Sequence, residues 1–301
     1  MRITPNSSAD SALYYIQQGR AKLDKISEQL ISSQNINRPS DDPIATNLLL
    51  NIADRVKTSD QYKSNIDKTQ IQMQITSTAL QGMYDTVELA KGLASSLING
   101  SSETGTLANA VSQLQTLKQQ LVDYGNTRNG ETYIFAGADS TTAPFSATAP
   151  YYSGDETTLN INIADSSTMK LNIPGNQILT ADTAASQPYG STNILQAMDD
   201  LITAVGANNT AGIAAGAQAL VAGAKQVNAA QNEIATRQIR LNTMETMNTN
   251  NRSTLMTVVD NVQAVDYAKL GVELTQQQTA FQASLSATAK LTQLSLLDYV
   301  S

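Results

Sequence analysis

The sequence predicts a mainly α fold, in which a long antiparallel helical coiled-coil rod is built from both chain ends and carries a small inserted β-rich domain. Three observations lead to this prediction. A seven-residue apolar period runs through both halves of the chain, apolar and polar residues alternate in its middle, and four of the seven prolines fall in that middle. Heptads are typical of long packed helices, whereas strict alternation is typical of strands.

The first half carries the clearest heptad pattern. Mostly apolar residues form a row spaced by seven, and from Ser59 onward a companion row follows three residues after each member. This is the a/d arrangement of a coiled-coil seam, diluted by several polar members. The rows are Ile52, Ser59, Ile66, Met73, Leu80, Val87 and Ala94, then Tyr62, Thr69, Thr76, Met83, Ala90 and Leu97.

The second half shows a similar row, in steps of seven from Ile213 to Val262. Prolines are absent from 44 to 143 and from 189 to the end, so long helices are permitted there. The periodicity alone fits an ordinary helical bundle as well as it fits a rod. We expect the rod, with an N-terminal helix packed lengthwise on a C-terminal one, over residues 43–137 and 205–263.

The start of the first long helix is marked by Pro39-Ser40-Asp41-Asp42-Pro43. Asp42 is placed to be the N-cap and Pro43 the first helical residue, and the carboxylates suit the positive end of the helix dipole. An adjacent Asp pair is also compatible with acid–base chemistry or a metal site. The capping interpretation is favoured, because neighbouring side chains on a turn rarely converge and no other ligand is close in sequence.

The middle of the chain predicts a β-hairpin. Apolar residues alternate with polar ones over 159–163, a polar turn follows at 165–167, and the alternation resumes over 169–173. Residues 133–137 form another short β-prone run. Residues 138–210 contain one basic residue, Lys170, against seven acidic ones, which is a net charge of −6. We therefore expect residues 138–204 to form an acidic, β-rich, solvent-facing insert.

Both chain ends carry helical apolar stripes. The C-terminal stretch has a second, largely Ala-containing face and only three charges from 270 to 301. We expect residues 1–42 and 264–301 to form an inner terminal-helix domain. A helix that is apolar on two faces must be buried on both, and the N-terminal helix cannot cover both, so we expect the C-terminal end to bury itself against other molecules. Burial in a conventional core is the alternative. The expected assembly residues are Leu13, Ile16, Leu23, Ile26, Leu30, Leu270, Leu274, Phe281, Leu285, Leu291 and Leu294.

Composition excludes most familiar catalytic chemistry. The 301 residues include no Cys and no His, which removes thiolate nucleophiles, imidazole bases and the usual zinc ligands. The net charge of −7 disfavours nucleic-acid binding. No run of about 18 apolar residues predicts a membrane span, and the N-terminus lacks the apolar stretch of a secretory signal. We expect no catalytic, cofactor-binding or metal-binding residues.

Several short motifs resemble the flagellin family. They are the opening Met1-Arg2-Ile3-Thr4, the stretch 34–43 (Gln-Asn-Ile-Asn-Arg-Pro-Ser-Asp-Asp-Pro), the segments 262–268 and 282–285, and Ser295-Leu296-Leu297-Asp298-Tyr299. A further segment, 130–137 with Pro144-Phe145, resembles a Gly-x-x-Tyr-x-Phe-Ala-Gly…Pro-Phe signature of the hook-associated members of that family. Its matching positions here include Gly130, Tyr133, Phe135, Gly137 and Phe145.

This resemblance implies a structural role at the junction between the flagellar hook and filament. It implies a homo-oligomer in a helical tube, with contacts to another hook-side junction protein and to flagellin. It also implies secretion through the flagellar type III channel, with an export chaperone at the C-terminal region, and terminal segments that order on assembly. Two alternatives remain open: a small flagellin that forms the filament itself, and an exported adhesin with a ligand-binding insert.

Overall fold

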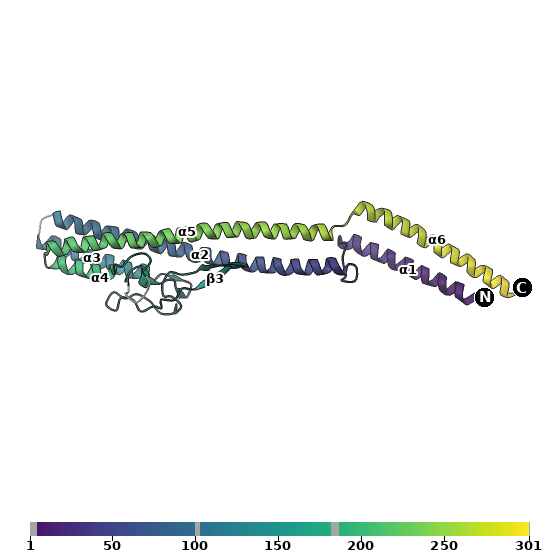
Figure 1. Cartoon of the computed structure of the whole chain (residues 1–301), viewed down its shortest axis with the longest axis horizontal. Coiled ribbons are helices and arrows are strands. Elements are labelled where there is room, and N and C mark those ends of the chain that lie inside the picture. The colour runs from purple at the N-terminus through teal and green to yellow at the C-terminus, as the bar shows by residue number, and fades with distance from the viewer. Residues whose placement is uncertain (1–4, 100–102, 182–186, 301) are drawn as a thin grey trace. The chain divides into compact units, whose positions relative to one another are not determined.

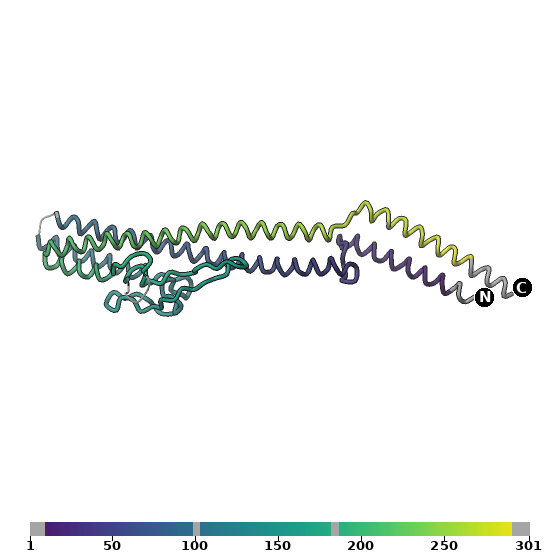
Figure 2. The backbone as a smooth tube through the Cα atoms, in the orientation of Figure 1, coloured from purple at the N-terminus to yellow at the C-terminus, as the bar shows by residue number. Residues whose placement is uncertain are grey.

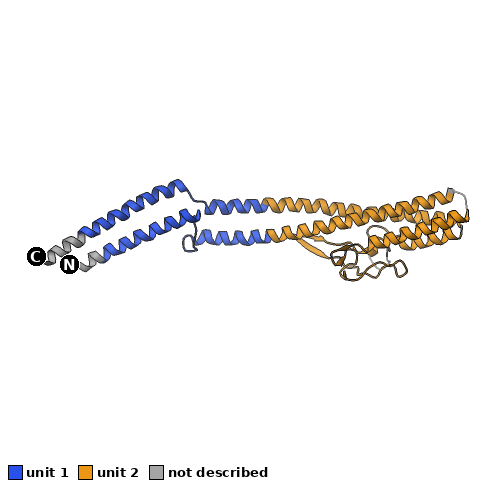
Figure 3. Ribbon diagram, turned by 180° about the vertical axis from the view of Figure 1, so that it is seen from behind, with its two compact units in different colours: residues 1–58, 251–301 blue, residues 59–250 orange. Residues whose placement is uncertain are grey.

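A computed structural model describes residues 5–99, 103–181 and 187–300, and within these it leaves the side chains of 5–9, 99 and 291–300 undescribed. The chain divides into two compact units (Figure 3). Unit 1 comprises residues 1–58 and 251–301, and unit 2 comprises residues 59–250. The mainly α fold is confirmed, because helices account for most of the described residues and the strands are few and short.

Two long helices provide the framework, α2 (Pro43–Asn99) and α5 (Thr210–Gln263). In unit 2 they run side by side, and the shorter α3 (Thr104–Gly125) and α4 (Ile194–Gly206) lie along them (Figure 1). The backbone tube in Figure 2 follows the same path and brings out the looped segment between α3 and α4. The three-part division expected from the sequence, with boundaries at 42/43, 137/138, 204/205 and 263/264, stays a prediction.

The heptad rows form the buried seam of the α2 helix. All seven members of the first row are buried, as are the four central members of the companion row. On α5 the first five members of the corresponding row, from Ile213 to Leu241, are buried too, and the last three are half-buried. The seven-residue spacing thus identified the side of each helix that packs inward.

Hydrogen bonds between side chains fix the antiparallel pairing of α2 with α5 in unit 2. The Ser59 hydroxyl donates to Asn248 Oδ1 over 2.7 Å, and Asn248 Nδ2 donates to the Ser59 carbonyl over 2.8 Å. Farther along, Gln70 Nε2 donates to Glu245 Oε2 over 2.9 Å. Rising numbers on one helix meet falling numbers on the other, which defines antiparallel helices.

The predicted hairpin is confirmed. Strand β3 (Asn160–Ala164) pairs antiparallel with β4 (Ser167–Lys170), with Ile161 opposite Met169 and an irregularity between Asn162 and Ala164. A second two-stranded pair consists of β1 (Arg128–Asn129) and β2 (Thr132–Tyr133). The β-prone run at 133–137 forms a strand only at its first residue. Ile134, Phe135 and Ala136 are buried, but their backbone is irregular.

The end of the expected β-rich insert differs from the prediction. Residues 194–204 form most of α4, so this α-helix begins ten residues before the expected end of the insert, and a short 3-10 helix, η1 (Gly175–Gln177), precedes it. Asn193 is the N-cap, since its Oδ1 accepts a hydrogen bond from Gln196 N over 3.0 Å. Ile194, Leu195, Met198 and Leu201 then give a helical spacing, and all four side chains are fully buried. The boundary predicted from the sequence was placed near the end of the acidic stretch, and that stretch continues through this helix.

Both edges of the β3–β4 hairpin are covered by the long helices. From α2, Asn65 Nδ2 donates to the Asn162 carbonyl of β3 over 2.8 Å. From α5, Arg237 Nη1 donates to the carbonyls of Lys170 and Asn172, over 3.4 and 3.2 Å. An uncovered strand edge presents unpaired backbone groups, so these bonds protect the hairpin and attach it to the helix pair.

A partly buried ion pair attaches α3 to α4. Lys118 Nζ lies 2.5 Å from Asp199 Oδ1, and the Tyr151 hydroxyl donates to Asp199 Oδ2 over 2.5 Å. Burial, together with this hydrogen bond to a carboxylate, raises the pKa of Tyr151 to about 12. The phenol therefore stays protonated at neutral pH and remains a hydrogen-bond donor.

The seam predicts a contrast between two leucines of α2. Leu80 is fully buried, whereas Leu89 is 62% exposed. Leu80→Ala should lower the free energy of unfolding by about 2–5 kcal/mol, because it leaves a cavity, and Leu89→Ala should change it by less than about 0.5 kcal/mol. Denaturant unfolding followed by circular dichroism measures both. Equal effects of the two substitutions would contradict the assignment of the seam.

Candidate assembly surface

Unit 1 pairs the two chain ends, α1 (Pro5–Ser32) and α6 (Tyr267–Val300), side by side (Figures 1 and 2). The Phe281 ring packs directly on the backbone of Gly19, where a Cβ would lie 3.3 Å from the ring. Gln277 Nε2 also donates to the Gly19 carbonyl, over 3.4 Å. Part of each terminal stripe is therefore used to join the two ends of the same chain.

The residues expected to form the assembly interface divide by exposure. Leu13 and Leu285 are 55% and 43% exposed, and Leu270 is buried. The half-buried members are Ile16, Leu23, Ile26, Leu30, Leu274 and Phe281. Leu291 and Leu294 lie in α6, but their side chains are outside the described residues. The α1–α6 pairing covers much of the stripe and leaves its two outer leucines open to a further partner.

A second set of apolar side chains in unit 1 is more exposed than the predicted stripe. Tyr14 and Tyr15 are 61% and 65% exposed, and Val272 of α6 is 58% exposed. The small residues Ala280, Ala283 and Ala287 also face solvent. Sequence reasoning identified the Ala face but missed the tyrosines, which adjoin Leu13 on another face of α1. These side chains add to the exposed apolar surface of unit 1.

A shallow apolar groove lies between the unit 1 parts of α2 and α5. It has a volume of about 410 Å³ and is lined mainly by aliphatic side chains. Leu50 and Met256 on its walls are 60% and 38% exposed. The lining residues are Thr46, Leu49, Leu50, Ala53, Val56, Met256, Val259 and Gln263. The groove adds a second open apolar surface to the same unit.

The connection from α1 to α2 is ordered by two aspartates. Asp42 caps α2, since its Oδ1 accepts from Ile44 N over 3.0 Å and from Ala45 N over 2.9 Å, and Pro43 is the first helical residue. Asp41 closes the loop instead: its carboxylate lies 2.9 Å from Lys25 Nζ and accepts from Arg38 N over 3.0 Å. The hydrogen bond from Lys25 and those from the backbone hold the pKa of Asp41 below its usual value.

The glycines of the signature segment occupy backbone conformations that other residues rarely adopt. Gly130 has φ +62° in the turn between β1 and β2, and Gly137 has φ +77°. A Cβ on Gly137 would also lie 2.0 Å from the Asp155 carbonyl oxygen, so a side chain is excluded by space as well. Gly130 therefore turns the chain from β1 into β2, and Gly137 turns it after the hairpin, at the start of the insert.

The aromatic residues of the signature build the inside of the insert. Phe135 is fully buried, and its carbonyl accepts from Gly175 N over 2.8 Å. The Phe145 ring lies against the glycine backbones at 125 and 175 and packs on Tyr152 with ring centroids 5.1 Å apart. Tyr133 packs under the Arg128 guanidinium at 4.7 Å. The signature therefore has a structural explanation that the sequence alone did not supply.

The described residues offer little chemistry beyond packing. Within 5–99, 103–181 and 187–300, no group of three or more acidic side chains is placed to hold a metal ion. In the same part of the chain, no helix is apolar enough over a sufficient length to cross a membrane. What the geometry of unit 1 provides is exposed apolar surface on paired terminal helices.

Comparison with known proteins agrees with this arrangement. The family of the bacterial flagellin N-terminal helical region matches residues 3–140. The chain is 24% identical to flagellar hook-associated protein 3 of Salmonella typhimurium, with 98% of each chain aligned. It is 27% identical to the protein of the same name from Escherichia coli, over 68% of this chain and 67% of that one.

Solved structures share the fold. A flagellar hook-associated protein from Vibrio parahaemolyticus superposes with a TM-score of 0.67 at 22% identity, covering 74% of this chain and all of that one. Hook-associated protein 3 from Legionella pneumophila gives a TM-score of 0.61 at 13% identity, covering 70% and 98%.

Residues 3–140, a little under half of the chain, are therefore similar to the N-terminal helical region of bacterial flagellin. Over nearly its whole length, the chain is similar to hook-associated protein 3 of Salmonella typhimurium.

Gly137 gives a direct test of the signature. Gly137→Ala should lower the free energy of unfolding by more than about 1 kcal/mol, since Ala is strained at φ +77° and its methyl group meets Asp155. Gly92→Ala is the matched control, because Gly92 lies within α2 with open space around it, and it should stabilise by about 0.5–1 kcal/mol. Thermal and denaturant unfolding measure both changes. Destabilisation by the control, or none at Gly137, would contradict the interpretation.

Asp41 gives a pH-dependent test of the loop at 33–42. Because its pKa is lowered in the fold, the ionised carboxylate stabilises the loop above the unfolded pKa, near 3.9, and this contribution is lost as pH falls through the lower folded pKa. Amide exchange at Asn37 and Arg38, corrected for intrinsic rates, should lose protection in that window. Asp41→Asn should lack protection at all pH values, whereas Asp54→Asn should match the parent. Unchanged protection in Asp41→Asn would refute the role.

Proposed function

We propose that this chain is a structural protein of the bacterial flagellum that acts as an adaptor at the hook–filament junction and presents a helical assembly surface for flagellin. The observation that carries the proposal is the alignment with Salmonella hook-associated protein 3 over 98% of both chains, which includes both terminal helices. The role is mechanical rather than enzymatic, in keeping with the absence of Cys and His from the sequence.

The proposed mechanism uses the exposed apolar surface of unit 1. Tyr15 on α1, Val272 on α6 and Leu50 on α2 each leave more than half of their accessible surface open to solvent. Copies of the chain that bury these side chains against one another, head to tail and without ring closure, form a helical tube. A hook-side junction protein binds the lower end of that tube, and flagellin binds its upper end.

The proposal includes export. The subunit leaves the cell through the flagellar type III channel, with a chaperone on its C-terminal region until export begins. The amphipathic α6 has the features that such a chaperone needs, since Val272 and Leu285 are exposed on it. A chain without thiols also avoids disulfide cross-links on its way through an oxidising compartment.

Two observations disfavour the alternative that this chain is a small flagellin forming the filament itself. The segment 130–137 with Phe145 follows the hook-associated signature, and the relatives are hook-associated proteins. Under the proposal, the purified chain does not grow long filaments unaided. Spontaneous growth of micrometre fibres would favour the flagellin alternative instead.

Removing about 30 residues from each end tests the adaptor role. Cells that lack the native gene and express the truncated chain should export flagellin without attaching it to the hook, because the exposed apolar surface of α1 and α6 is missing. Swimming assays and electron microscopy of isolated hooks give the readout. A truncated chain that still joins filament to hook would contradict the proposal.

A point substitution separates loss of the surface from loss of folding. Tyr15→Asp places a charge on an exposed apolar site of α1, and Gln17→Asp places the same charge on an exposed polar site of that helix. Tyr15→Asp should reduce the number of filamented hooks severalfold, whereas Gln17→Asp should leave it near the parental value. If the two variants gave equal numbers of filamented hooks, Tyr15 would not belong to the proposed surface.

A further inference from the structure

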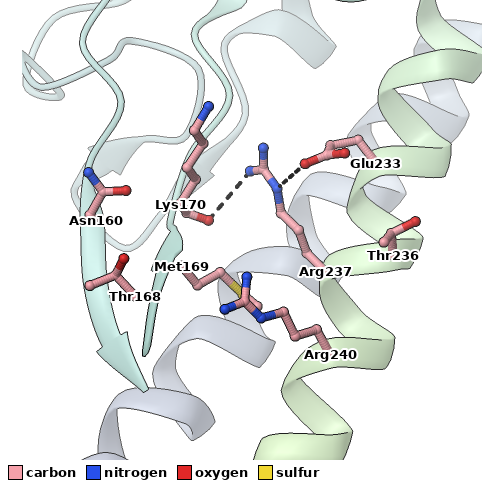
Figure 4. A pocket seen from close by; sticks show the side chains of 8 residues that line it. All are labelled: Asn160, Thr168, Met169, Lys170, Glu233, Thr236, Arg237 and Arg240. Atoms are coloured by element: carbon pink, nitrogen blue, oxygen red, sulfur yellow. Dashed lines mark hydrogen bonds and ion pairs between the residues drawn. The ribbon is translucent and has the colours of Figure 1, made fainter. Parts of the chain in front are cut away.

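A cationic pocket lies in unit 2 between α5 and the outer side of the β3–β4 hairpin (Figure 4). Its volume is about 360 Å³. Glu233, Arg237 and Arg240 come from one face of the helix, and Asn160, Thr168 and Lys170 come from the two strands. The walls of the pocket are therefore a helix on one side and, on the other, a hairpin that is anchored on that helix.

The charges of the pocket do not balance. Three of the eight lining residues are cationic and one is acidic. That carboxylate is already engaged, since Glu233 Oε1 accepts from Arg237 Nε over 2.9 Å. Arg240 Nη2 donates to a neutral group, the Ser167 hydroxyl, over 2.8 Å. Among the described residues, no acidic side chain pairs with the Lys170 ammonium. Two positive charges are left in excess.

Attachment of the hairpin explains only part of this arrangement. Arg237 Nη1 covers the β4 edge, and Arg237 is only 8% exposed, so its guanidinium is held in place. The Lys170 side chain takes no part in that attachment, because it is the backbone carbonyl of Lys170 that accepts from Arg237. A fixed guanidinium beside two solvent-accessible cations is a geometry that suits a carboxylate.

The remainder of the insert is acidic. Lys170 is the single basic residue of 138–210, and Asp139, Glu156, Asp165 and Asp200 are exposed there. The positive pocket of one copy of this chain is therefore electrostatically complementary to the negative insert surface of another copy. We propose that the pocket receives a carboxylate side chain from the insert of a second copy of this protein. The inference rests on the proposed function, because assembly into a tube is what places two inserts side by side.

Self-association of the full chain tests the proposal. Lys170→Glu reverses one free charge and leaves the hydrogen bonds of the hairpin intact, because only the backbone of Lys170 takes part in them. Lys225→Glu is the matched control, since Lys225 is an exposed lysine of the same helix α5 outside the pocket. In sedimentation experiments at low salt, Lys170→Glu should weaken self-association by about fivefold, and Lys225→Glu should not. Added salt should likewise weaken the self-association of the parent protein.

Cross-linking identifies the partner group. Full-length ¹⁴N and ¹⁵N protein are mixed, and a carbodiimide joins amines to carboxylates that are in direct contact. We expect mixed-isotope peptides that link Lys170 to an acidic residue of 138–204, and fewer of them in Arg240→Gln. A chain that stays monomeric, equal association of both lysine variants, or Lys170 linked only within one chain would each overturn the inference. None of these results bears on filament attachment by the truncated chain, so the proposed function is judged separately.

Discussion

The burial of the α2 and α5 heptad seam is the interaction on which the rest of unit 2 depends. Ile66, Met73, Leu80 and Val87 are all fully buried, and Leu220 and Val227 of α5 are buried with them in one core cluster. Burial of apolar surface is the dominant favourable term in folding. The same core contains Phe135, Ile163 and Met169, so the insert has no separate core and folds onto the helices.

The seam tolerates polar members because each finds a local partner. The hydroxyls of Thr69, Thr76 and Thr86 donate to the carbonyls of residues 65, 72 and 82 on their own helix, over 2.7–2.8 Å. Ser59 and Asn248 satisfy each other across the helix pair. A paired polar layer in a coiled coil costs stability and fixes register, because sliding by one turn would leave both groups unpaired. The diluted heptad therefore specifies one alignment of α2 with α5.

Sequence patterns predicted those features that are set by local periodicity. The heptad rows predicted the buried side of α2, and alternation over 159–173 predicted the β3–β4 hairpin. Tertiary contacts decided the rest. Ile134 and Ala136 are β-prone yet irregular, because the backbone at Gly137 turns sharply against Asp155. The cationic pocket needed Lys170 and Arg240, 70 positions apart, to be brought together by the hairpin, and no local signal marks that pairing.

The C-terminal helix was predicted to assemble through two apolar faces, and the structure uses one of them for the α1–α6 pairing. What is left exposed is the surface that we propose for neighbouring subunits. Cryo-electron microscopy of the intact hook–filament junction tests this most directly. The account predicts this chain in a short zone between hook and filament, with Tyr15 and Val272 buried between adjacent subunits. Finding the chain throughout the filament, or finding both side chains exposed in the assembled tube, would contradict it.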